Sequence, residues 1–338
     1  MAPAARTWPT ADISRRLCHV LGVAGTAVDC LLPDGYTDSI DATNSVRPEK
    51  VASETALLLY VASTTNSQPR IAALIESVAA RLIPFSRSPK TLVNACLEPA
   101  MALDYAFPHI FLSKLGLYDH HVDEVVRAAL ESSASGGRER PPHRVLEQHW
   151  IEDLFGETTG DSTDRSRRRL SARHSALARS LNLLSSSRDD VYAFTHALMY
   201  LSRFQAAAPR LPRSRAAILI DAESALANSL DEEDYDLAGE LLLTWPLTGA
   251  SWSAAASFGF HVLTSVEERA GFLPTPNTRL ERIVKLEGIA RTRYLLATAY
   301  HTTYVMGLLC AVALGPGRCP PASVPVRNAV HGGARPLH

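Results

Sequence analysis

The sequence predicts an all-α fold in which repeated helix pairs form an α/α toroid or incomplete barrel around a central cavity. Ala and Leu are abundant, and runs of alternating β-branched residues are too few to predict a strand. Apolar residues recur at helical spacing between Pro and Gly breaks. A short sequence pattern also occurs twice, which is typical of stacked or circularly arranged units.

Apolar periodicity places the individual helices, with boundaries good to a few residues. The predicted helices lie near residues 51–63, 70–83, 92–115, 120–131, 172–185, 188–207, 214–230, 235–248, 252–270 and 279–313. Three stretches rich in Ser, Gly, Pro or Arg interrupt the periodicity and are predicted as loops or disorder: 132–142, 157–169 and the tail from residue 315.

These elements predict one all-helical domain over residues 1–314, followed by a disordered tail over 315–338. The domain is expected to consist of two similar halves, about 1–131 and 170–314. A short amphipathic segment lies between the two irregular stretches, and it predicts a helix at 143–155 that joins the halves.

Composition argues against several classes of function. The formal net charge of -1 provides no field that would attract nucleic acid or an anionic membrane. His301 and three threonines interrupt the longest apolar run, 295–314, which favours a buried helix over a membrane span. The N-terminus lacks the layout of a signal peptide, so a cytoplasmic location is expected. The five cysteines have no CxxC spacing, which argues against a disulfide framework or a zinc knuckle.

Nucleotide and nucleophile motifs are also missing. The sequence contains no GxGxxG and no GKS or GKT, so no nucleotide cofactor is expected. It contains no GxSxG elbow and no local cysteine-protease signature, which leaves nucleophilic hydrolysis without support.

The internal repeat contains histidines and glutamates. Tyr105-Ala-Phe-Pro-His109 recurs as Tyr192-Ala-Phe-Thr-His196, and Val51-Ala-Ser-Glu54 resembles Leu237-Ala-Gly-Glu240. A further histidine, His301, lies in the apolar segment 299–304. Pro108 would disrupt a continuous helix, so Tyr105 and His109 are not expected to share one unless Pro108 begins it.

Helical spacing gives His196, Glu240 and His301 mainly apolar neighbours, so all three are expected to point inward. Burying an ionisable group without a partner costs about several kcal/mol. These groups are therefore expected to find one another, a tyrosine or a metal. A core histidine bonded to a carbonyl group, Tyr192 or Tyr304 is the structural alternative.

In an enclosed cavity, histidines and a carboxylate would suit Fe, Zn or Cu. The predicted metal ligands are His109, His196, His301 and Glu240. Glu54 or Asp221 would orient a ligand or act as general base.

The second half of the chain resembles a family of bacterial proteins. Thr195-His196-x-x-x-Tyr200, Asp236-Leu-Ala-Gly-Glu240-Leu-Leu and Tyr300-His301-Thr-Thr-Tyr304-Val together resemble an uncharacterised all-helical bacterial family associated with specialised-metabolite gene clusters. The resemblance covers residues 188–312. It implies a helical fold and a role in biosynthetic tailoring, and it supports His196, Glu240 and His301 as site positions. The segment 201–204 departs from the acidic, glycine-containing turn of that family.

Three functions follow as hypotheses. The first is a metal-dependent tailoring enzyme that acts on a small molecule or modified peptide, with Glu240, Tyr200 and Tyr304 as catalytic residues. The second is a helical-repeat protein-interaction module without catalysis. The third is a metal-free cyclase or isomerase that uses the same His and Glu side chains as acid and base. The substrate, the reaction and the oligomeric state, including a homodimer, stay open.

Overall fold

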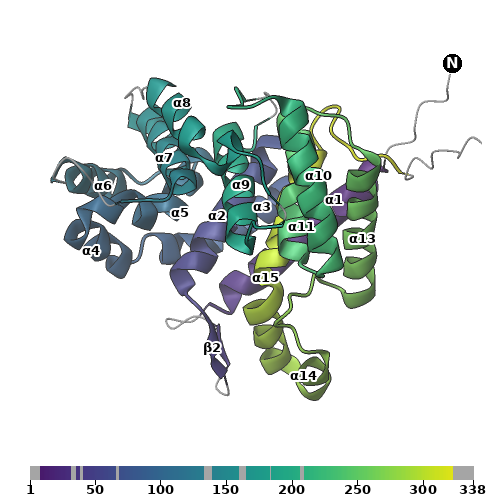
Figure 1. Cartoon of the computed structure of the whole chain (residues 1–338). Coiled ribbons are helices and arrows are strands. Elements are labelled where there is room, and N and C mark those ends of the chain that lie inside the picture. The colour runs from purple at the N-terminus through teal and green to yellow at the C-terminus, as the bar shows by residue number, and fades with distance from the viewer. Residues whose placement is uncertain are drawn as a thin grey trace, which may run out of the picture.

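The computed structural model describes residues 8–31, 36–38, 41–65, 68–132, 139–159, 165–182, 184–205 and 209–322 (Figure 1). In chain order the main elements are α1 (Thr10–Asp29), β1 (Tyr36–Asp38), β2 (Asp41–Val46), α2 (Pro48–Thr65), α3 (Pro69–Ser86), α4 (Pro89–Leu97), α5 (Ala102–Lys114), α6 (His120–Ser132), α7 (Pro142–Thr159), α8 (Arg165–His174), α9 (Arg188–Ser202), α10 (Arg215–Asp231), α11 (Tyr235–Leu242), α12 (Thr244–Thr248), α13 (Ala254–Ala270), α14 (Leu280–Lys285) and α15 (Gly288–Ala313). The predicted helical fold class is therefore confirmed.

Three elements were not predicted: one helix and two strands. Helix α1 carries apolar residues at helical spacing, but Gly22 and Gly25 lower its helix propensity. Strands β1 and β2 form an antiparallel pair, so the prediction that the chain has no strand was wrong. Their sequences, YTD and DATNSV, offer little of the apolar alternation that marks a strand.

Several predicted boundaries also differ. The single helix expected at 92–115 is divided, because Glu98 and Pro99 end α4 and a short 3₁₀ turn precedes α5. Residues 165–169, expected to be part of a loop, form the first half of α8, whereas most of the helix expected at 172–185 is absent. The bridging helix at 143–155 is present within α7. The central parts of the loops predicted around 132–142 and 157–169, and the tail from residue 323, lie outside the described residues.

Helix α15 lies at the centre of the packing, against α1, α2 and α11. Gly307 permits its close approach to α1, because a Cβ atom there would lie 2.6 Å from Val20 Cγ1. Among the described residues, α15 has the length and composition of a membrane span, but 83% of its apolar window is buried inside the protein. It resembles the core helix of a soluble protein.

Six helices pack in succession. Helix α2 packs against α5, α5 against α7, α7 against α9, α9 against α11, α11 against α15, and α15 against α2. Most of the remaining helices pack against one of these six: α3 on α2, α1 on α15, α10 and α13 on α11, α8 on α7, and α4 and α6 on α5. Figure 1 shows α4–α8 on one side and α10, α11 and α13 on the other.

A buried ion pair joins the first helix to the second half of the chain. Arg16 on α1 is 1% exposed and bonds to Glu267 on α13, which is 6% exposed. Asp12 Oδ2 accepts from Arg16 Nε at 3.3 Å, and Glu268 contacts the same guanidinium group. Each charge is buried, so each depends on the other for compensation.

His109 occupies a separate network, away from the other predicted ligands. Pro108 lies inside α5, and Tyr105 and His109 do share that helix. His109 Nδ1 accepts a hydrogen bond from Arg87 Nε at 3.1 Å, and Nε2 donates to Asp123 Oδ1 at 2.9 Å. Both ring nitrogens are occupied, so the prediction of His109 as a metal ligand is corrected to a structural role.

We expect Arg16→Met to lower the free energy of unfolding by about 3–5 kcal/mol, because it leaves the Glu267 carboxylate buried without a partner. The double variant Arg16→Met/Glu267→Met should recover most of this loss. Denaturant unfolding followed by circular dichroism measures both. Arg15→Met is the matched control, since Arg15 is 61% exposed and its pair with Asp12 should contribute about 0–1 kcal/mol. Equal losses in the single and double variants would contradict the argument.

Burial lowers the pKa of His109 below its ordinary value of 6.5, although its hydrogen bond to Asp123 opposes the shift. The unfolded chain therefore takes up this proton at a higher pH than the folded chain. Stability contributed by the neutral ring is present above about pH 6.5 and is lost as the pH falls through the folded pKa.

We expect His109→Gln to weaken this pH dependence and to lower stability near pH 8 by about 1–3 kcal/mol. Unfolding free energies near pH 8 and pH 5 test this. His121→Gln alters an exposed histidine of α6 and should leave both quantities unchanged. A pH dependence identical in wild type and His109→Gln would exclude His109 as its source.

Candidate functional site

A cavity of about 520 Å³ lies among the six central helices. Side chains from α2, α5, α7, α9, α11 and α15 line it, and the lining combines apolar, aromatic and charged groups. The cavity brings together five of the residues predicted from sequence: His196, Tyr200, Glu240, His301 and Tyr304.

His301 on α15 lies between two carboxylates from different helices. Its Nδ1 atom lies 3.0 Å from Glu54 Oε2 on α2, and its Nε2 atom lies 3.4 Å from Asp236 Oδ1 on α11. Burial alone would lower the pKa of His301, but the two carboxylates outweigh it and raise the pKa to about 9. Burial likewise opposes ionisation of Glu54, yet the charge of His301 brings the pKa of Glu54 to about 2.

Helix α11 presents Asp236 and Glu240 one turn apart on the same face. The helix begins there because the Asp234 side chain accepts a hydrogen bond from the Leu237 amide at 3.2 Å and so caps its first turn. Gly239 lets α15 come close, since a Cβ atom at this position would lie 2.7 Å from Val305 Cγ1. The motif therefore places two carboxylates against the helix that carries His301.

Asp236, Glu240 and His301 each offer one ligand atom, and these three atoms all lie within 4.8 Å of one another. Asp236 Oδ1 is buried and has no hydrogen-bond partner among the described residues. Burial raises the pKa of Asp236, although the positive charges of His301 and Arg188 oppose the shift. These three residues form the group best placed to hold a metal ion.

Glu240 also connects this group to His196 on α9. Thr195 Oγ1 donates to Glu240 Oε2 at 2.5 Å, and His196 Nδ1 lies 3.3 Å from the same oxygen. His196 Nδ1 also donates to the Tyr192 carbonyl oxygen at 3.1 Å. Burial raises the pKa of Glu240, but these contacts with His196 and Thr195 outweigh it and lower the pKa. In its neutral form, the His196 ring would carry its proton on Nδ1, which leaves the Nε2 lone pair available.

Aromatic rings pack around His196. Tyr192 stacks on it with ring centroids 3.7 Å apart, and Tyr200 and His143 meet it edge-on at 5.6 and 6.1 Å. Burial, aided by the charges of His196 and Arg144, lowers the pKa of His143 to about 4. Burial also raises the pKa of Tyr200 well above its ordinary value. The rings of His143 and Tyr200 are therefore neutral near pH 7.

The remaining predicted residues divide between the cavity and the surrounding core. Tyr304 lines the cavity, and its hydroxyl lies 2.9 Å from Thr55 Oγ1. Burial raises the pKa of Tyr304, so the phenol stays protonated. Asp221, considered as an orienting group, instead bonds to Arg213 Nη2 at 2.6 Å and accepts from the Leu181 amide at 3.2 Å. Asp221, like His109, therefore lies outside the cluster.

Sequence reasoning missed two groups at this site. The first is Asp236, although its spacing of four from Glu240 on an apolar helix could have identified it. The second is the ion pair of Arg144 and Glu147 on α7, whose atoms Nη1 and Oε2 lie 2.7 Å apart at the cavity wall. No local pattern distinguishes that pair from an ordinary i, i+3 surface pair.

Comparison with known proteins gives a family and no named relative. No curated protein and no solved structure matches the chain. A family described as "Domain of unknown function (DUF6895)" matches residues 24–311, a span that contains every residue of the cavity cluster from Glu54 to His301. The chain therefore belongs to this family.

Proposed function

We propose that the protein is a metal-dependent enzyme that acts on a small organic molecule or modified peptide bound in the central cavity. The observation that carries the proposal is the convergence of Asp236, Glu240 and His301, whose ligand atoms lie within 4.8 Å of one another beside that cavity. A role in biosynthetic tailoring follows from the sequence resemblance.

The charge of the cluster favours a cation. Three carboxylates, from Glu54, Asp236 and Glu240, lie around the imidazole of His301. A second imidazole, that of His196, lies 3.3 Å from Glu240. Lys50 and Arg188 reach Glu54 and Asp236, but their side chains are 56% and 52% exposed, so water screens them. Glu240 is 3% exposed. A divalent cation would offset the excess negative charge at the most buried point of the cluster.

The donor set narrows the choice of metal. One imidazole with two carboxylates suits Fe²⁺, Zn²⁺ or Mn²⁺, and it offers no soft ligand of the kind that favours Cu(I). In this arrangement Glu54 orients His301 through Nδ1, as an outer carboxylate commonly does for a ligating histidine. His196, predicted as a ligand, is better placed to exchange a proton with a bound substrate through Nε2.

The cavity can accommodate a substrate next to such an ion. Its volume of about 520 Å³ falls within the range of roughly 300–1,000 Å³ that is typical of small-molecule sites. Aromatic rings from α9 line part of it, and Tyr304 and Val305 of α15 also contribute to the lining. We further propose that α2, α5, α7, α9, α11 and α15 form the inner ring of an incomplete α/α barrel, because each packs against the next and each contributes to the cavity lining.

A metal-free acid–base enzyme is the second candidate. Both nitrogens of His301 face a carboxylate, Glu54 at 3.0 Å and Asp236 at 3.4 Å, and an imidazole held in this way can transfer protons without an ion. The two candidates differ in whether binding a cation is part of the function.

We expect the purified protein to bind about one equivalent of Mn²⁺, Zn²⁺ or Fe²⁺, because a single cluster offers the ligand set. Asp236→Asn, Glu240→Gln and His301→Ala should each raise the metal dissociation constant at least about a hundredfold. Isothermal titration calorimetry and elemental analysis measure this. Asp221→Asn, which alters a carboxylate outside the cluster, should leave metal binding unchanged. Folded protein that binds none of these ions would exclude the metal enzyme and leave the acid–base candidate.

Glu54→Gln should weaken metal binding less than substitution of a direct ligand, because Glu54 contacts His301 and not the proposed ion. We expect the dissociation constant to rise about 10–100-fold, as for other outer carboxylates of metal sites. Lys50→Gln is the matched control. It removes the exposed partner of Glu54 and should change the constant by less than about twofold. If Glu54→Gln weakened metal binding as much as Asp236→Asn does, Glu54 would instead be assigned as a direct ligand.

A further inference from the structure

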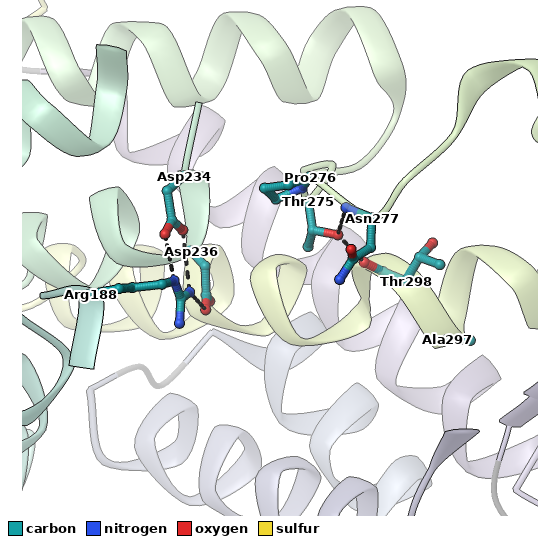
Figure 2. A pocket seen from close by; sticks show the side chains of 8 residues that line it. All are labelled: Arg188, Asp234, Asp236, Thr275, Pro276, Asn277, Ala297 and Thr298. Atoms are coloured by element: carbon teal, nitrogen blue, oxygen red, sulfur yellow. Dashed lines mark hydrogen bonds and ion pairs between the residues drawn. The ribbon is translucent and has the colours of Figure 1, made fainter. Parts of the chain in front are cut away.

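A second pocket of about 320 Å³ opens on another face of Asp236 (Figure 2). Figure 2 shows Arg188, Asp234 and Asp236 together on one side, and Thr275, Asn277 and Thr298 on the other. Thr275 Oγ1 donates to the Thr298 carbonyl oxygen at 2.8 Å, which holds the loop against α15. The pocket is therefore walled by hydroxyl, amide and carboxylate groups.

Asp236 separates this pocket from the cavity cluster. Its Oδ2 atom accepts from Arg188 Nη2 at 3.1 Å in the second pocket, and its Oδ1 atom lies 3.4 Å from His301 Nε2 in the cluster. The Asp236 side chain is 13% exposed. The second pocket thus ends at one of the three proposed metal ligands.

The pocket has the size and lining for a hydrated cation. Six waters occupy roughly 180 Å³ at about 30 Å³ each, which is less than the 320 Å³ available. Asp234 and Asp236 supply negative charge, and the opposite wall supplies neutral oxygen atoms.

Arg188 controls the electrostatics of this pocket. Among the residues that line it, Arg188 is the single cation, and it bonds to Asp234 Oδ2 at 2.7 Å as well as to Asp236. Its side chain is 52% exposed, so it can swing toward solvent without disturbing the core. The central cavity has Arg47, Lys50 and Arg144 in its lining, together with the carboxylates of Glu49, Glu54, Asp104, Glu147 and Glu240.

We propose that a hydrated divalent cation reaches the Asp236–Glu240–His301 cluster through this second pocket, with Arg188 as its electrostatic gate, while the central cavity receives the organic substrate. This inference rests on the proposed function. It assigns to Arg188, Asp234 and the Thr275–Thr278 turn a role in metal loading.

Stopped-flow mixing of the full-length apo protein with Co²⁺, followed by the visible absorption of the bound ion, measures the association rate separately from affinity. Asn277→Trp places a large ring over an exposed position of the pocket, and we expect it to slow association about tenfold or more with an unchanged dissociation constant. Arg188→Gln removes the positive gate and should speed association about threefold or more.

Two controls make the outcome decisive. Asn277→Ala removes the amide without covering the pocket, and Ser53→Phe obstructs the central cavity instead; neither should slow association. Slow loading in Ser53→Phe with normal loading in Asn277→Trp would overturn the proposal and assign the route to the central cavity. The proposal would also be overturned if the wild type and all four variants bound Co²⁺ at the same rate. No Co²⁺ binding in the wild type would reject the proposed function itself, which is a distinct result.

Discussion

The contact of His301 with Glu54 and Asp236 ties together three of the central helices. An imidazole on a largely apolar helix such as α15 is costly to bury unless its nitrogens find partners. The partners come from α2 and α11, so satisfying one side chain fixes the relative positions of three helices. The cavity beside them exists because these helices are held at that separation.

Small residues let the polar cluster form within tight packing. Gly239 stands between Asp236 and Glu240 in sequence and faces Val305, where any larger residue would push α11 away from α15. Gly307 does the same between α15 and α1. In this way the glycine of the α11 motif is as necessary for the site as the two carboxylates, although it has no side chain to offer.

In the proposed function, one site serves two different molecules. Glu240 and His301 line the central cavity, whereas Asp236 lines the second pocket, so the same group of ligands is reached from two directions. A large, aromatic cavity suits an organic molecule, and a smaller oxygen-lined pocket suits a hydrated ion. The family span from residue 24 to residue 311 contains both.

The sequence by itself determined the helical class and most helix positions, and it predicted side chains that line the central cavity, among them His196, Glu240 and His301. These follow from local rules, because helical periodicity shows which faces are apolar and an ionisable residue on such a face must have a partner. The sequence could not choose the partners. His109 and His196 occupy equivalent positions in the repeat, yet Arg87 and Asp123 bind the first, whereas the second faces the cavity. Only tertiary packing decides which distant side chain lies within hydrogen-bond reach, and that is why Asp236, and not His109, joins His301.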